Sequence, residues 1–141
     1  MREAINVNAD EQKKPALTKN ILVIDDDPDI TNLIARALSD GKYSVTIMDQ
    51  SELAYGPANE IKTCDIAVID MFMPDIGGIE GIKKIRRENA SCKVIAISGG
   101  WGCMDSSEAL SAAEKIGADM VLSKPFRINE VRETVCKMLD S

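Results

Sequence analysis

The sequence predicts an α/β protein built on a parallel β-sheet with helices on both faces. Five apolar, strand-like runs alternate along the chain with five segments of helical character. Strict alternation of strands and helices requires crossover connections, which join parallel strands. The chain has 141 residues, of which 45% are hydrophobic, and this supports a single domain with its own core.

The amino-terminal segment 1–19 is polar, mixed in charge and without a clear period. We expect a flexible tail there, followed by one domain at 20–141. The domain begins with an apolar strand at 21–24. A helix follows this strand, because Asp27 is a suitable N-cap, Pro28 fits a first turn, and an apolar stripe runs down one face.

Gly41 ends the first helix, and the β-branched segment 43–48 predicts the second strand. The segment 51–62 predicts only a short or irregular helix, because Gly56 and Pro57 interrupt it. Beyond this segment the pattern becomes regular again. We expect strands at 65–70, 94–97 and 120–123, and helices that carry Ile79–Arg87, Leu110–Ile116 and Ile128–Met138.

Four of the predicted strands end in polar side chains that can carry chemistry. The first ends in Asp25–Asp27, and the later ones end in Asp70, Ser98 and Lys124. The carboxyl ends of parallel strands meet at one edge of the sheet, where open α/β proteins bind ligands. A carboxylate cluster beside a hydroxyl and a lysine suits Mg²⁺ and a phosphoryl group. The sequence therefore predicts the functional site at this edge.

The composition excludes several kinds of chemistry. The chain has no histidine, so no imidazole can serve as a base, a metal ligand or a phosphate carrier. The net charge of −6 argues against a nucleic-acid surface on this chain. No segment has membrane length and no signal-peptide pattern opens the chain, so we expect a cytoplasmic protein. We expect reduced, mostly structural thiols at Cys64, Cys92, Cys103 and Cys136.

Four motifs in this order resemble the receiver domain of response regulators in two-component signalling. They are the Ile24–Pro28 block, the Asp70–Pro74 block with its following glycines, Ser98 after an apolar strand, and Gly117–Asp119 leading to Lys124–Phe126. Each motif alone is weak, but together they are specific, and they cover the chain from Asn20 onward. The resemblance implies a flavodoxin-like (βα)5 fold, a three-layer sandwich whose parallel sheet has strand order 2-1-3-4-5.

The resemblance also implies which residues form a metal site. Asp70 matches the aspartate that accepts the phosphoryl group. Asp25 and Asp26 match the acidic pair that holds Mg²⁺, together with Asp70 and the main-chain carbonyl of Phe72. Mg²⁺ prefers a few carboxylate ligands completed by waters and phosphate oxygens, which agrees with this set.

Two further positions match residues that contact the phosphoryl group in the family. Ser98 matches the hydroxyl residue that responds to this group, and Lys124 matches the lysine that pairs with the acceptor and then with the phosphate. The bond from Lys124 to Pro125 is implied to be cis. Val121 stands where the family usually has an aromatic residue, and its stiff side chain cannot make the same large swing.

A receiver of this kind takes its phosphoryl group from a histidine kinase or a histidine phosphotransfer protein. It passes the signal to a downstream protein that the sequence does not identify, and we expect no direct contact with nucleic acid or a membrane. We expect no enzymatic turnover beyond its own phosphorylation and dephosphorylation. Two alternatives remain: a Mg²⁺-dependent aspartyl phosphatase, which would need a second aspartate where this chain has Phe72, and an unphosphorylated pseudo-receiver scaffold, which would lack an acidic residue or the lysine.

Overall fold

The computed structural model describes residues 18–71, 77–98 and 117–140, together with positions 108, 111, 114 and 115. Within these residues, five strands form one sheet: β1 (Lys19–Ile24), β2 (Tyr43–Met48), β3 (Ile66–Asp70), β4 (Lys93–Ser98) and β5 (Met120–Ser123). Their order is β2-β1-β3-β4-β5, and every neighbouring pair is parallel. The predicted fold class and strand order are confirmed.

Helices connect β1 to β2, β2 to β3 and β3 to β4, as the alternation predicts, and another helix follows β5, whereas most of the predicted helix at 110–116 lies outside the described residues. These helices are α2 (Pro28–Ala37), α3 (Gln50–Tyr55), α4 (Asn59–Thr63), α5 (Gly77–Glu88) and α7 (Ile128–Asp140). The segment predicted as short or irregular is two short helices, with Gly56 as the C-cap of α3 and Pro57 between the two. No helix in the described part of the chain is long and apolar enough to cross a membrane.

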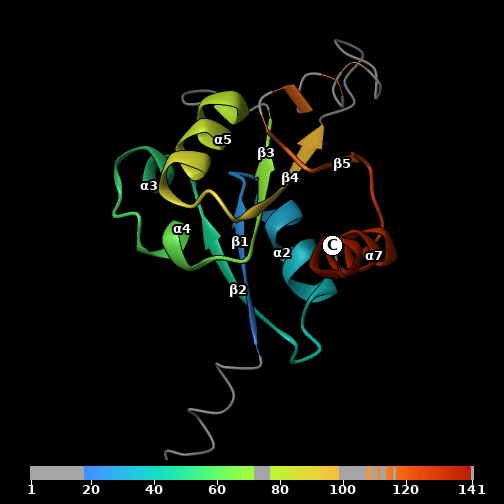
Figure 1. The fold of residues 1–141 in the computed structure, drawn as a ribbon. Helices are drawn as coiled ribbons and strands as arrows, with labels where there is room; N and C mark the ends of the chain where they lie inside the picture. The colour runs from blue at the N-terminus through green and yellow to red at the C-terminus, as the bar shows by residue number, and fades with distance from the viewer. Residues whose placement is uncertain are drawn as a thin grey trace, which may run out of the picture.

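The sheet is the middle layer of three, with α3, α4 and α5 on one face and α2 and α7 on the other (Figure 1). Side chains point alternately to the two faces of a strand. In β1, Leu22 and Ile24 therefore pack with α3, α4 and α5, whereas Ile21 and Val23 pack with α2 and α7. The central strand β3 is buried along its whole length, which explains why its sequence is a continuous apolar run.

Helix α2 begins and packs as its sequence predicts. Asp27 is the N-cap, and its carboxylate accepts a 2.9 Å hydrogen bond from the main-chain N–H of Asp29. Pro28 lies in the first turn, where the helix requires no N–H donor. Ile34 and Ala37 are fully buried, and burial of an isoleucine side chain contributes about 1.5–3 kcal/mol.

The run of charged residues at 83–87 predicts a solvated face of α5. In the structure, two of these residues are half-buried, so the prediction is wrong for them. Lys84 is half-buried, and its Nζ donates a 2.5 Å hydrogen bond to the carbonyl of Leu53 in α3. Arg86 is also half-buried, and it pairs with Asp119 at 2.9 Å. These two cations therefore fasten α5 to neighbouring segments.

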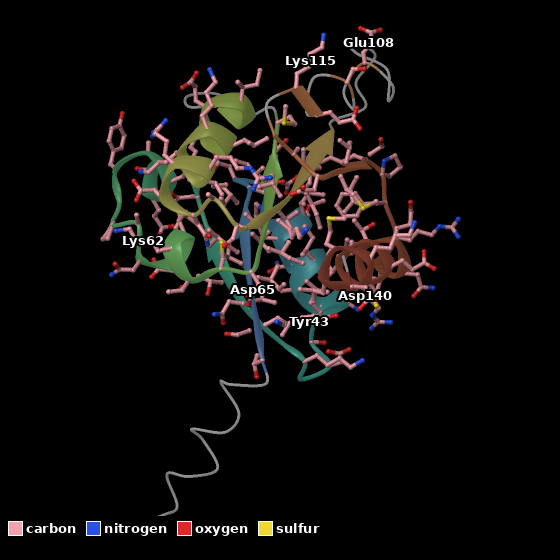
Figure 2. The ribbon with its side chains drawn as sticks, viewed as in Figure 1. Tyr43, Lys62, Asp65, Glu108, Lys115 and Asp140 are labelled. Atoms are coloured by element: carbon pink, nitrogen blue, oxygen red, sulfur yellow. The ribbon has the colours of Figure 1, made fainter. Side chains whose placement is uncertain are left out.

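The strands run in one direction, so they all begin at one edge of the sheet and end at the other. Figure 2 shows Asp65, just before β3, at the first edge, and Glu108 and Lys115 beyond the second. The Asp65 carboxylate accepts a 2.7 Å hydrogen bond from the main-chain N–H of Asn20, which links β1 to the segment before β3 at the first edge. The polar strand ends singled out by the sequence lie at the second edge.

Candidate functional site

Asp70 is the last residue of β3, and its strand lies between β1 and β4. The residue is buried, with 8% of its surface exposed. The strand end is held in place, because the N–H of Met71 donates a 3.0 Å hydrogen bond to the carbonyl of Ile97 in β4. The predicted phosphoryl acceptor is therefore a carboxylate anchored on a central strand.

Asp25 follows β1 directly and is buried more deeply, with 4% of its surface exposed. Its Oδ1 accepts a 2.9 Å hydrogen bond from the N–H of Asp27, whereas its Oδ2 has no hydrogen-bond partner among the described residues. Burial raises the pKa of Asp25 to about 6, and the Asp70 carboxylate adds to the increase, while the Asp27 N–H and Lys124 oppose it. The site thus contains a carboxylate whose negative charge is only partly compensated.

Lys124 follows β5, and its ammonium group lies between the two buried carboxylates. Its Nζ is 3.8 Å from Oδ2 of Asp25 and 3.8 Å from Oδ2 of Asp70. These separations are longer than direct hydrogen bonds, so the lysine balances both charges without fully satisfying either. The peptide bond from Lys124 to Pro125 is cis, as the resemblance implies.

Asp26 differs from its neighbour in burial and in contacts. It is exposed, and its Oδ1 accepts a 3.0 Å hydrogen bond from the main-chain N–H of Gln50 at the start of α3. The two adjacent acids are therefore not equivalent: Asp25 faces the interior and Asp26 the surface. Beside them lies an open depression of about 480 Å³, lined by Asp25, Asp26, Pro28, Thr31, Ile47, Asp49, Gln50 and Ser51.

The other predicted site residues are placed only in part. Ser98 ends β4 opposite Ser123, which locates its main chain at the same edge of the sheet as Asp70. The side chain of Ser98, the whole of Phe72 and the loop 99–104 lie outside the described residues. Val121 is half-buried and packs against the core on the α3, α4 and α5 face.

The donor set fits a divalent cation such as Mg²⁺. Within the described residues, no group of three or more acidic or cysteine side chains forms a preformed metal cage. Mg²⁺ seldom needs one, because it binds through one or two carboxylates and keeps several waters. Oδ2 of Asp25 is a hard oxygen that receives no hydrogen bond from the described residues, and Asp70 supplies a second carboxylate nearby. Asp26 lies at the exposed rim of this pair.

Gly78, in the first turn of α5, packs against the end of β3. Its N–H donates a 3.1 Å hydrogen bond to the carbonyl of Met71. A Cβ at this position would lie 2.9 Å from the carbonyl oxygen of Asp70 and would overlap the Cα of Met71. The glycine thus permits α5 to approach the main chain of the predicted acceptor. We did not predict this role from the sequence, and the signal available was only the glycine pair after the Asp70 motif.

Replacing Gly78 with alanine is therefore expected to destabilise the fold by about 1–3 kcal/mol, because main-chain atoms cannot yield to the new methyl group. It should also slow phosphoryl uptake, since Asp70 would be displaced. Urea unfolding and a labelling rate measure the two effects. Gly77→Ala is the matched control: Gly77 has φ of 75°, but a methyl group added to it would meet nothing within 4 Å, so only backbone strain applies. Phosphoryl uptake that is slowed equally in both variants would contradict the packing argument.

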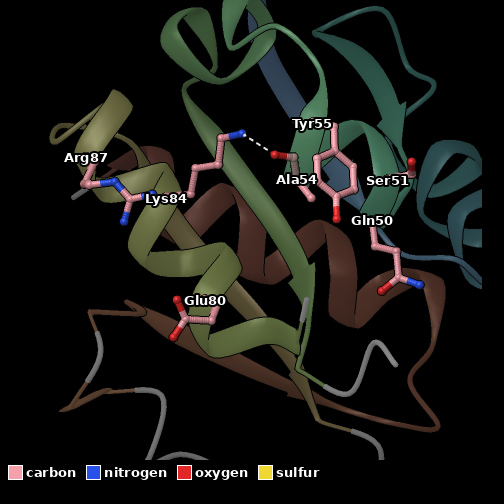
Figure 3. Close-up of a pocket in the computed structure, with 7 residues that line it drawn as sticks. All are labelled: Gln50, Ser51, Ala54, Tyr55, Glu80, Lys84 and Arg87. Atoms are coloured by element: carbon pink, nitrogen blue, oxygen red, sulfur yellow. Dashed lines mark hydrogen bonds between the residues drawn. The ribbon is translucent and has the colours of Figure 1, made fainter. Parts of the chain in front are cut away.

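A second depression, of about 530 Å³, lies between α3 and α5 (Figure 3). Its lining consists of Gln50, Ser51, Ala54, Tyr55, Glu80, Lys84 and Arg87. None of the predicted site residues that the structure describes lines it, and Lys84 at its wall donates to main-chain carbonyls of α3. The volume alone does not make it the functional site, because the buried charges that can do chemistry lie at the strand ends.

The fold and the acidic edge with its lysine define a receiver domain, and the comparisons with known proteins agree. The sequence model of the response regulator receiver domain matches residues 21–136. The chain belongs to this family, and it is a receiver domain of the two-component response regulators.

Curated relatives are response regulators of bacteria. The chain is 29% identical over 111 residues to the probable transcriptional regulatory protein TcrX of Mycobacterium tuberculosis, covering 79% of this chain and 45% of the relative. It is 29% identical over 123 residues to the alkaline phosphatase synthesis transcriptional regulatory protein PhoP of Bacillus subtilis, covering 87% of this chain and 49% of the relative. The chain thus spans less than half the length of these two relatives.

Solved structures have the same fold. A response regulator from Thermotoga maritima superposes with a TM-score of 0.74 at 24% identity, covering 89% of this chain and all of the other. A CheY-like receiver domain protein from Methanospirillum hungatei gives a TM-score of 0.71 at 25% identity, covering 87% and 94% of the two chains. The parallel sheet described above is therefore the receiver fold.

Proposed function

We propose that this receiver domain accepts a phosphoryl group on Asp70 and relays a signal through the resulting change in conformation. One observation carries the proposal: the Lys124 ammonium group lies 3.8 Å from carboxylate oxygens of both Asp25 and Asp70. Two buried carboxylates that share a single lysine have an excess of negative charge. A divalent cation held beside these carboxylates would balance that excess, and Lys124 would present positive charge to an incoming phosphoryl group.

The proposed roles follow from this charge balance. An oxygen of Asp70 forms a bond to phosphorus while the bond from phosphorus to the donor breaks. Lys124 compensates the Asp70 carboxylate before transfer and the phosphoryl oxygens afterwards. Asp25 and Asp26, with Asp70 and the main-chain carbonyl of Phe72, are proposed to hold Mg²⁺. When bound, this cation would neutralise phosphoryl oxygens and align them with the acceptor.

Ser98 is proposed to contact the transferred group. Ser98 is the last residue of β4, and Asp70 is the last residue of β3. The two strands are neighbours in the sheet and are hydrogen-bonded to each other. A hydroxyl at that place can donate to a phosphoryl oxygen. The contact would couple phosphorylation to the loop that follows β4.

The proposed donor is a histidine kinase or a histidine phosphotransfer protein. These 141 residues contain no histidine, so a phosphohistidine donor must lie outside them. The proposed recipient of the signal is a downstream protein that the sequence does not identify. We propose no direct binding of nucleic acid by this chain, because its net charge is −6. The relatives that are named as transcriptional regulators are longer proteins.

We also propose that the chain's catalysis is confined to its own phosphorylation and dephosphorylation. An aspartyl phosphatase would need a second acid two residues after Asp70, and Phe72 stands there. A pseudo-receiver would lack an acid or the lysine, and this chain retains Asp25, Asp26 and Lys124. Residues 20–141 are proposed to form the receiver domain, together with Lys19, which begins β1, and the segment before Lys19 is proposed to lie outside it. The proposed location is the cytoplasm.

Incubation with a small acyl phosphate donor and Mg²⁺ tests the function directly. We expect the protein to take up one phosphoryl group, and we expect base and hydroxylamine to release it, because the product is an acyl phosphate. Intact-protein mass spectrometry measures the gain, and excess EDTA is the control that should suppress it. Absence of uptake from acyl phosphate donors and from a panel of histidine kinases would contradict the proposal, and so would uptake unaffected by EDTA.

A further inference from the structure

Two cysteine thiols are in contact at the edge of the sheet opposite the proposed phosphorylation site. Cys64 precedes β3, and Cys92 precedes β4. Their Sγ atoms lie 3.3 Å apart, and both residues are buried, with 6% and 2% of their surfaces exposed. Both thiols are free, and neither takes part in the proposed phosphoryl chemistry.

Asn89 forms hydrogen bonds with the main chain of both cysteines. Its Nδ2 donates to the carbonyl of Cys64 at 3.0 Å and to the carbonyl of Ile61 at 2.8 Å. Its own main-chain carbonyl accepts a 3.2 Å hydrogen bond from the N–H of Cys92. Because one side chain and its main chain bind both segments, the thiols face each other without any rearrangement of the fold.

The two thiols are not equivalent as acids. The hydrogen bond between the two thiols lowers the pKa of Cys64, against the effect of burial. The same hydrogen bond, together with burial, raises the pKa of Cys92. Of the two, Cys64 has the more acidic thiol, which favours it as the nucleophile.

A small cavity lies against Cys64. It has a volume of about 90 Å³ and is lined by Asn20, Ile21, Leu22, Thr46, Glu60, Thr63 and Cys64. A water molecule occupies about 30 Å³ in the liquid, so a reagent as small as hydrogen peroxide fits the cavity. Cys64 lines it and Cys92 does not, which again makes Cys64 the first point of attack.

We propose that Cys64 and Cys92 form a redox modification site, at which hydrogen peroxide converts the two thiols into an intramolecular disulfide. In the first step the Cys64 thiolate attacks one peroxide oxygen, the O–O bond breaks, and the leaving hydroxide takes a proton to become water. In the second step Cys92 sulfur attacks the sulfenic sulfur of Cys64, the S–O bond breaks, and a second water leaves. Two thiols lose two electrons in total, and one peroxide gains them.

The bond would join the starts of two strands that end at the proposed site. β3 runs from beside Cys64 to Asp70, and β4 runs from beside Cys92 to Ser98. A cross-link between residues 28 positions apart in sequence restricts the unfolded chain and raises the melting temperature. It leaves Asp70 and Lys124 at the far edge untouched, so phosphoryl uptake should continue in the oxidised protein.

The test uses the full chain with Cys103→Ser and Cys136→Ser, which keeps only the thiol pair. After peroxide treatment we expect a loss of two hydrogen atoms by intact mass, one peptide linking Cys64 to Cys92 under non-reducing conditions, and a melting temperature several degrees higher. Dithiothreitol should reverse all three. Stepwise addition of oxygen to either cysteine without a linked peptide would overturn the proposal, and so would linkage that forms only in urea.

Two single variants in that background test the order of attack. Cys92→Ser should leave Cys64 as a sulfenic acid that a dimedone probe labels, whereas Cys64→Ser should leave Cys92 unlabelled at the same peroxide concentration. Circular dichroism confirms that each variant is folded before treatment. Labelling of Cys92 at the rate of Cys64 would contradict the assignment of Cys64 as the thiol that reacts first.

Discussion

Replacing Asp70 with asparagine is expected to abolish phosphoryl uptake. The amide keeps the shape of the side chain, but it is neutral and a much weaker nucleophile toward phosphorus. Asp70 is the last residue of the central strand β3, and its Oδ2 lies 3.8 Å from the Lys124 ammonium group. Labelling with an acyl phosphate donor, read by intact mass, should fall to background in the variant.

Two controls separate loss of the acceptor from loss of the fold. Asp70→Asn should unfold cooperatively and should not be less stable than the wild type, because it removes one of the two carboxylates that share a lysine. Glu133→Gln, a change at an exposed position of α7, should be labelled at the wild-type rate. Label of the same base-labile kind in Asp70→Asn would place the acceptor elsewhere.

Replacing Asp25 with asparagine is expected to stabilise the protein in the absence of divalent cations. At neutral pH Asp25 is a buried carboxylate near a second one, and no donor in the described part of the chain reaches its Oδ2. Asparagine removes that charge. The pKa of Asp25 rises from 3.8 to about 6 on folding, and since each pKa unit is worth about 1.4 kcal/mol, the gain at pH 7.5 is at most about 3 kcal/mol.

The sign of the pH dependence follows from the raised pKa. Between about pH 4 and pH 6 the folded protein binds more protons at Asp25 than the unfolded chain does. This contribution therefore lowers the free energy of unfolding of the wild type as pH rises through that window. Urea unfolding at pH 4, 5, 6 and 7.5 should show the variant's advantage growing with pH and then levelling off. An advantage that is independent of pH would contradict this account.

Magnesium supplies the second part of this prediction. At a concentration of ten times its Kd, a ligand specific to the native state adds about 1.4 kcal/mol. We expect this stabilisation in the wild type and not in Asp25→Asn, measured by thermal unfolding with and without MgCl₂. Asp26→Asn is the matched control for the apo protein: Asp26 is exposed and hydrogen-bonded to Gln50, so neutralising it should not stabilise the fold. Equal magnesium shifts in wild type and Asp25→Asn would contradict the proposed role of Asp25.

Most of the fold was predictable from local patterns in the sequence. The strand at 43–48 has the predicted bounds, and Asp27 and Pro28 begin α2 as expected. The interruption at Gly56 divides the following segment into two short helices. Such features depend on residues that are neighbours in sequence, and periodicity, caps and breakers act over that range. The order of the strands, which the family resemblance implies, is confirmed by their pairing.

The charged residues of α5 show where local reasoning fails. Lys84 and Arg86 belong to a run that predicts a solvated face, but each reaches carbonyl oxygens of another segment. The pattern of charges marks which side of a helix is polar. It does not tell whether a neighbouring segment offers acceptors within reach of a long side chain.

The sequence by itself determined the sheet edge at which Asp25, Asp70 and Lys124 meet, because parallel strands carry their last residues to one side. Only the tertiary structure decided that Asp25 is buried and Asp26 exposed, although the two are adjacent and chemically identical. Only the tertiary structure brought Cys64 to Cys92. Burial and contact depend on what packs around a residue from distant parts of the chain, and those neighbours are set by the assembled layers.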